Sequence, residues 1–109
     1  MLRFAVIGYG YWGPNIVRNL RGLEGCQVVG ICDQTPAARK RIQAAHPGIP
    51  VYSDANELIT SSEVDAVAVI TPVWTHYELT KAALEHGKHV FVEKPFTSNV
   101  AQGEELINL

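Results

Sequence analysis

The chain has 109 residues and a formal net charge of -2, with 9 basic and 11 acidic side chains mixed along it. A chain of this length buries roughly two-thirds of its unfolded surface, which is enough for one core. It has no basic patch that would indicate nucleic-acid binding. Its apolar runs are much shorter than the roughly twenty residues of a membrane helix, and its N-terminus leads straight into an expected strand. We therefore expect one cytoplasmic domain that binds neither nucleic acid nor membrane.

A glycine-rich turn follows the first expected strand, Phe4–Ile7, with the sequence GYGYWG. Asp33 follows the third of its glycines by about twenty positions. Gly8 lets the chain turn off the strand, Gly10 has no Cβ to hold a pyrophosphate away from the main chain, and Gly13 lets the next helix pack closely. The unpaired amides of that helix attract a diphosphate. The pattern predicts a dinucleotide site; the alternative is an ordinary glycine-rich turn.

Helix and strand patterns alternate along the rest of the chain. Thr35 can cap a helix that has Pro36 at its first position. Thr75 with Glu78 resembles a capping box, and Asp54 with Glu57 resembles a second capping pair. The expected helices cover residues 13–23, 36–46, 54–59, 75–87 and 98–109, and the expected strands cover 4–7, 28–32, 51–53, 65–71 and 88–92. This alternation predicts an α/β fold with a Rossmann-type doubly wound parallel sheet of five strands, in the order 3-2-1-4-5, truncated before a sixth strand.

The two cysteines are expected to be reduced thiols. Cys26 and Cys32 lie at opposite ends of one expected strand, about 20 Å apart at 3.3 Å per residue, which is too far for a disulfide. Neither cysteine nor any histidine has metal-ligand spacing. The sequence therefore predicts no metal site.

Asp33 predicts which nicotinamide cofactor is preferred. A carboxylate at the end of the second strand accepts hydrogen bonds from the adenosine ribose hydroxyls and repels a 2′-phosphate, so NAD is favoured over NADP. The neighbouring Gln34 adds no positive charge, and we expect Arg39, Lys40 and Arg41 on a solvated helix face rather than in a phosphate clamp. The alternative for Asp33 is a helix-capping or turn aspartate.

Two further motifs follow the fourth and fifth expected strands. They are TPVWTH at 71–76 and EKP at 93–95, the latter ending the run AALEHGKHVFVEKP. With GYGYWGPN at 8–15, these motifs make the whole chain resemble the NAD-binding domain of the Gfo/Idh/MocA oxidoreductases. GYGYWGPN resembles most closely the members that oxidise sugars or nucleotide sugars.

The resemblance implies roles for the EKP residues. In the family, the position of Glu93 contacts ribose hydroxyls beside the nicotinamide, and the position of Lys94 binds the cofactor and reaches the reacting hydroxyl. Lys94 is therefore the candidate catalytic residue, because an ammonium can stabilise a developing alkoxide or relay a proton. The alternative is a solvated lysine paired with its neighbour. Pro95 follows either a cis or a trans peptide bond.

Several loop residues are further candidates for cofactor binding. Trp12 and Trp74 either cover the cofactor or pack their loops onto the domain, and His76 is either a cofactor contact or, more often in such a position, a structural histidine. The remaining candidates are Tyr11, Thr71 and Pro72.

The resemblance also implies what a complete enzyme of this family carries. Family members have a second, α+β domain with most of the sugar pocket, a catalytic histidine and much of the oligomer interface, and that domain is absent from this chain. We expect residues 1–109 to bind NAD without efficient turnover, as part of a dehydrogenase and of a homo-oligomer. The alternatives are a non-catalytic module that senses NAD or NADH and a structural subunit.

Overall fold

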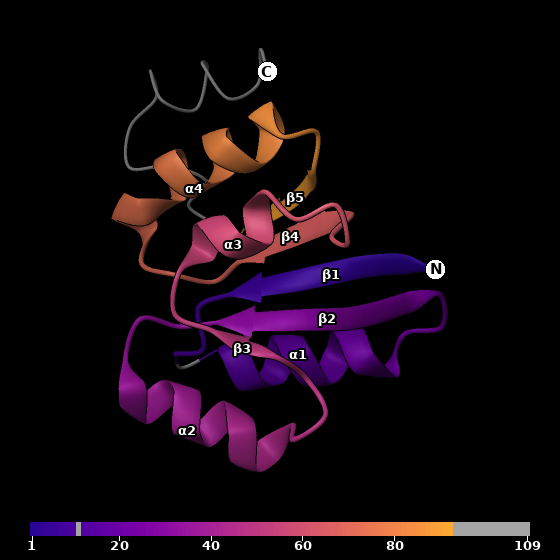
Figure 1. Cartoon of the computed structure of the whole chain (residues 1–109), viewed down its shortest axis with the longest axis vertical. Helices are drawn as coiled ribbons and strands as arrows, with labels where there is room; N and C mark the ends of the chain where they lie inside the picture. Colours follow the sequence, from indigo (N-terminus) through magenta and orange to yellow (C-terminus); the bar gives the residue numbers. More distant parts are fainter. Residues whose placement is uncertain (11, 93–109) are drawn as a thin grey trace.

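The computed structural model describes residues 1–10 and 12–92 (Figure 1). Its strands are β1 (Leu2–Ile7), β2 (Cys26–Cys32), β3 (Val51–Tyr52), β4 (Ala66–Val69) and β5 (His89–Val92). Its helices are α1 (Gly13–Gly22), α2 (Pro36–Ala45), α3 (Ala55–Ile59) and α4 (Val73–Glu85). All the strand pairs are parallel, and the strand order is β3-β2-β1-β4-β5. The predicted Rossmann-type architecture and strand order are confirmed.

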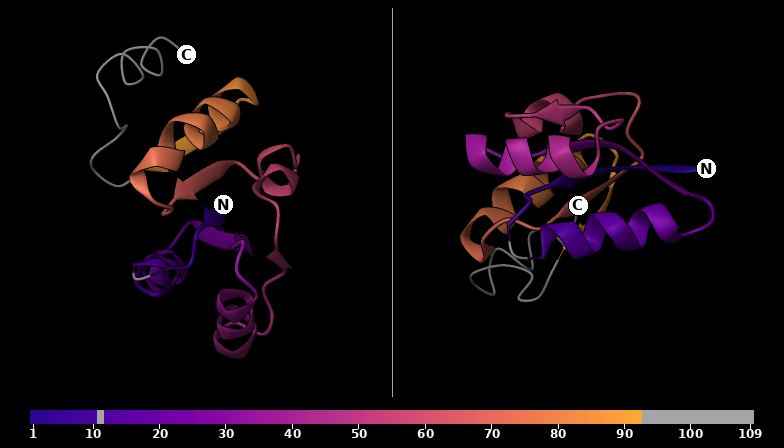
Figure 2. Two further views of the ribbon diagram at one scale, coloured as in Figure 1. Left: turned by 90° about the vertical axis from the view of Figure 1, so that its left-hand side faces the viewer. Right: turned by 90° about the horizontal axis from the view of Figure 1, so that it is seen from below.

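Helices cover both faces of the sheet, and α1 and α3 lie on opposite sides of it (Figure 2). Successive residues of β1 point to opposite faces. Phe4 and Val6 pack on the side of α1 and α2, whereas Ala5 and Ile7 pack on the side of α3 and α4. Because both faces are buried, β4 is apolar throughout, as expected for a parallel sheet covered on both sides.

The strand register brings three loops together at one edge of the sheet. Ile7, the last residue of β1, pairs with Cys32 on one side and with Val69 on the other. Since β1, β2 and β4 end level, the loops that follow them start side by side. This edge is where open α/β sheets bind their ligands.

Two of the predicted helix caps are present. Thr35 accepts a hydrogen bond from the Ala38 amide (3.3 Å) at the start of α2, and Asp54 accepts one from the Asn56 amide (2.9 Å) at the start of α3. A side-chain oxygen in this position satisfies an amide that has no partner within the helix.

The predicted capping box at Thr75 and Glu78 is wrong. Helix α4 begins at Val73, two residues earlier, with Pro72 as its N-cap and no side-chain cap. The Thr75 hydroxyl instead donates to the Pro72 carbonyl (2.6 Å). A threonine in the first turn of a helix can donate a hydrogen bond back to a main-chain oxygen. Thr75 therefore resembles a capping residue in the sequence although it lies inside the helix. The predicted helix at 98–109 lies outside the described residues.

Candidate functional site

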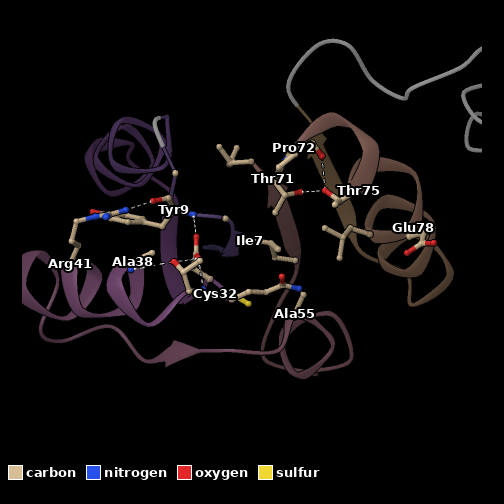
Figure 3. Close-up of a pocket in the computed structure, with 17 residues that line it drawn as sticks. Ile7, Tyr9, Cys32, Ala38, Arg41, Ala55, Thr71, Pro72, Thr75 and Glu78 are labelled. Atoms are coloured by element: carbon tan, nitrogen blue, oxygen red, sulfur yellow. Dashed lines mark hydrogen bonds between the residues drawn. The ribbon is translucent and has the colours of Figure 1, made fainter.

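A cavity of about 550 Å³ opens at the carboxyl edge of the sheet (Figure 3). Its volume falls within the range of about 300–1,000 Å³ that is common for small-molecule sites. The walls come from the loops after β1, β2 and β4 and from the facing sides of α2 and α4. The glycine turn, Asp33 and the first residues of the TPVWTH motif, which are far apart in sequence, meet in this one cavity.

The glycine turn has two positions that the fold itself requires to be glycine. Gly8 has a φ of 102°, and a Cβ there would lie 2.9 Å from the carbonyl carbon of Ile70. A Cβ at Gly13 would lie 3.0 Å from the Gly8 carbonyl oxygen. These values match the turn and the close packing that the sequence predicted.

Gly10 differs from these two glycines. It lines the cavity, its φ is not positive, and a Cβ there would meet no atom within 4 Å. The protein's own packing therefore does not need glycine at this position. A missing side chain beside open space is what a bound pyrophosphate requires, because the phosphate oxygens must approach the main chain.

Asp33 ties the loops after β1 and β2 together. Its Oδ2 atom accepts a hydrogen bond from the Tyr9 amide (2.8 Å), and its Oδ1 atom accepts from the amide and the hydroxyl of Thr35 (2.9 Å each). Partial burial by itself would raise the pKa of Asp33, but the hydrogen bonds from Thr35 and Tyr9 outweigh it and lower the pKa below its ordinary value. Asp33 is thus an ionised turn aspartate that also faces the cavity.

Thr71, Pro72 and Thr75 form the opposite wall of the cavity (Figure 3). The hydroxyls of Thr71 and Thr75 lie 2.5 Å apart. Because Thr75 uses its single proton on the Pro72 carbonyl, Thr71 is the donor in this pair. The Thr71 oxygen therefore keeps its lone pairs as acceptors at the cavity wall.

His76 supports this wall from behind. Its side chain is only 3% exposed, and its Nε2 atom donates to the Thr71 carbonyl (2.7 Å). His76 is not among the residues that line the cavity. In the described structure it positions the loop after β4.

Lys40 and Arg41 of α2 are exposed, as expected for a solvated helix face, and Arg39 is half-buried. The two arginines also make contacts with neighbouring loops that the sequence did not predict. Arg39 donates to the carbonyls of Asp33 (3.0 Å) and Gln34 (2.8 Å). Arg41 lines the cavity and donates to the Tyr9 carbonyl (3.3 Å). All three hydrogen bonds join α2 to neighbouring loops, so helical periodicity contained no signal for them.

Both cysteines are free thiols. Cys32 is buried at the floor of the cavity, where burial raises its pKa to about 11, reinforced by the negative charge of Asp33. A thiol with such a pKa is protonated at neutral pH and is a poor nucleophile.

Of the other predicted site residues, the structure describes only some. Trp12 precedes α1 with 52% of its surface exposed and does not line the cavity. The side chain of Trp74 and the residues Tyr11, Glu93, Lys94 and Pro95 lie outside the described part of the structure.

Two classes of feature are not found in residues 1–10 and 12–92. No group of three or more His, Cys, Asp or Glu side chains there is arranged to hold a metal ion. No helix in this part of the chain is long and apolar enough to cross a membrane.

A family model described as an oxidoreductase family with an NAD-binding Rossmann fold, Gfo/Idh/MocA, matches residues 2–109. Inositol 2-dehydrogenase of Rhodococcus jostii (strain RHA1) is 37% identical over 107 residues, which cover 97% of this chain and 29% of that protein. The NADP(+)-dependent scyllo-inositol 2-dehydrogenase of Bacillus subtilis (strain 168) is 32% identical, over 99% of this chain and 33% of that protein.

A solved structure has a closely similar fold. The crystal structure of a probable dehydrogenase from Thermotoga maritima superposes with a TM-score of 0.92 at 34% identity, over 98% of this chain and 32% of that one. The chain thus spans about a third of the length of such relatives. It belongs to the Gfo/Idh/MocA oxidoreductase family, in its NAD-binding Rossmann fold.

Proposed function

We propose that this member of the Gfo/Idh/MocA family is the NAD-binding part of an oxidoreductase that transfers hydride between a sugar-like secondary alcohol and a nicotinamide cofactor. The substrate class comprises sugars, inositols and nucleotide sugars, and two of the relatives are named as inositol dehydrogenases. The open space at Gly10 is the observation that carries the proposal, because Gly10 lines the cavity and a Cβ there would meet no atom within 4 Å.

Different described residues hold different parts of the dinucleotide. Gly8 and Gly13 shape the turn, and Gly10 admits the pyrophosphate. Asp33 accepts a hydrogen bond from the adenosine ribose at one end of the cavity. Thr71, with Pro72, offers acceptor lone pairs at the other end, held in place by His76.

We further propose roles for residues outside the described part of the structure or at its margin. Tyr11 and Trp12 cover the pyrophosphate side of the turn, and Glu93 binds ribose hydroxyls beside the nicotinamide. Lys94 is the catalytic residue, which holds or moves the proton of the substrate hydroxyl at its Nζ atom. When bound, the nicotinamide ring supplies the hydride chemistry, so the protein has to orient it and to manage that proton.

NAD is the proposed cofactor, with NADP as the weaker ligand. The support is Asp33, which is ionised at neutral pH, with a pKa below its ordinary value, and which repels a 2′-phosphate. The relatives include one that is named as NADP(+)-dependent, so the family as a whole does not decide the choice.

The remaining proposals concern the whole protein. Because the chain spans about a third of its relatives' length, we propose that a further α+β domain supplies the substrate pocket and that residues 1–109 alone turn over no substrate. The protein acts in the cytoplasm as a homo-oligomer. The two unpaired thiols are consistent with a reducing compartment.

Titration calorimetry of the chain with NAD, NADH and NADP tests the proposal. We expect NAD and NADH to bind with one site per chain and NADP to bind more weakly. A folded chain that binds none of the three would overturn the proposal. A protein of the relatives' length that binds NAD but reduces none of it with inositols, sugars or nucleotide sugars would favour the sensing module.

A further inference from the structure

The two arginines of α2, Arg39 and Arg41, are two residues apart but contact different parts of the structure. Arg39 donates hydrogen bonds to the main-chain carbonyls of Asp33 and Gln34 and does not itself line the cavity. Arg41 extends to the glycine turn, where it lies beside Tyr9 and lines the cavity (Figure 3). Among the described residues that line the cavity, Arg41 is the one with a positive charge.

Tyr9 holds Arg41 and Asp33 close to each other. The amide of Tyr9 donates to the Asp33 carboxylate (2.8 Å), and the carbonyl of the same residue accepts from Arg41 (3.3 Å). The two charged side chains therefore flank a single residue of the turn. A group bound to the ribose at Asp33 lies within the field of the Arg41 guanidinium, as the effect of Arg41 on the pKa of Asp33 also indicates.

Asp33 is less available as a ribose acceptor than an unpaired carboxylate would be. An ionised carboxylate has about four lone-pair positions. Three are used by donors from the protein, one from Tyr9 and two from Thr35. These donors also spread the negative charge of Asp33, which weakens its repulsion of a nearby phosphate.

The present bond of Arg41 is easily exchanged. Its acceptor is a neutral carbonyl at 3.3 Å, the side chain is exposed, and the guanidinium has further N–H groups to offer. A phosphate accepts from arginine in a two-pronged, charge-assisted geometry that is about twice as strong as a neutral hydrogen bond. Arg41 would therefore form stronger hydrogen bonds if its side chain turned from the Tyr9 carbonyl to a phosphate on the ribose.

We propose that Arg41 is a specificity-determining residue that recognises the 2′-phosphate of NADP, so that this chain binds NADP as well as NAD. The inference rests on the proposed function, since it concerns the same dinucleotide cavity. Asp33 still makes NAD the tighter ligand. Arg41 reduces the difference between the affinities for NAD and NADP. The cavity thus has one anionic and one cationic determinant on the two sides of Tyr9.

The test compares NAD and NADP affinities by calorimetry for the unchanged chain and for Arg41→Gln, Arg41→Lys and Lys40→Gln. Lys40 is the matched control, because it carries the same charge on the same helix but is exposed and outside the cavity lining. We expect Arg41→Gln to weaken NADP binding by roughly ten- to a hundredfold, the effect of losing a charged hydrogen bond. NAD affinity should change by less than about threefold, Arg41→Lys should keep part of the NADP affinity, and Lys40→Gln should change neither.

The outcomes separate this inference from the function on which it rests. A chain that binds NAD but no NADP, or an Arg41→Gln variant that loses affinity for both dinucleotides equally, overturns the role of Arg41 and leaves the NAD site intact. Equal NADP losses in Arg41→Gln and Lys40→Gln also overturn it, because they indicate general electrostatics. A chain that binds neither dinucleotide overturns the proposed function itself. Melting temperatures of all variants show whether a loss reflects unfolding.

Discussion

The main-chain amide of Tyr9 donates a 2.8 Å hydrogen bond to the carboxylate of Asp33, 24 residues further along the chain. This bond fixes the shape of the glycine turn from the neighbouring strand. Asp33 therefore has two functions in the proposed site, because it holds the turn in place and faces the ribose. A substitution at Asp33 tests both functions together.

Asp33→Ala should weaken NAD binding by about 1–3 kcal/mol, since the ribose hydroxyls and the Tyr9 amide both lose a charged acceptor. NADP should lose less, because the repulsion of its 2′-phosphate disappears with the carboxylate. Calorimetry measures both affinities. The matched control is Asp54→Ala, which removes a similar turn aspartate outside the cavity lining and should leave nucleotide binding unchanged. An unchanged chain that already binds NADP as tightly as NAD would contradict this account of Asp33.

Gly10→Val should abolish binding of NAD while leaving the circular dichroism and the melting temperature nearly unchanged. A Cβ at this position would meet no atom within 4 Å, so the new side chain would enter the open space beside the turn. Gly48→Val is the control, since Gly48 also has open space around it but does not line the cavity. Normal NAD binding by Gly10→Val would mean that the turn does not cradle the pyrophosphate.

Acid stability should depend on Asp65, which pairs with Arg3 (3.0 Å) at the amino end of the sheet. Hydrogen bonds from Arg3 lower the pKa of Asp65 from 3.8 to about 2. The pair is therefore fully stabilising above pH 3.8 and loses its contribution as the pH falls towards 2. Melting temperatures across this range should fall less steeply for Asp65→Asn than for the unchanged chain. Glu63→Gln, which removes the exposed partner of Arg3, should retain the steep fall. Parallel profiles for Asp65→Asn and the unchanged chain would contradict the assignment.

The chain by itself should associate with copies of itself at high concentration. In the described structure β5 lies at an edge of the sheet, and the side chain of Phe91 on it is 71% exposed. An apolar edge strand has unpaired main-chain groups that favour pairing with another chain. Light scattering over a concentration series should show a rising mass, and Phe91→Lys should reduce it. His89→Lys, at an exposed position on the same strand, is the control. A strict monomer at high micromolar concentration would refute this prediction.

The fold could be predicted from the sequence because its determinants are local. Apolar runs of strand length, the caps at Thr35 and Asp54, and the spacing of Gly8 and Gly13 each act within a few residues. Once alternating strands and helices were recognised, the right-handed crossover rule left few strand orders to consider. The same local logic failed at Thr75, where a hydroxyl suited to a cap bonds back to Pro72 inside the helix.

The sequence by itself determined the dinucleotide turn and the acidic residue opposite it, since strand, glycine spacing and Asp33 all lie within one βαβ unit. Only the tertiary structure decided what these residues touch. The bond from Tyr9 to Asp33, the reach of Arg41 to the Tyr9 carbonyl and the support of Thr71 by His76 depend on how loops and helices meet. Helical periodicity shows which face of a helix is polar, but it does not show which carbonyl lies within reach of an arginine on that face.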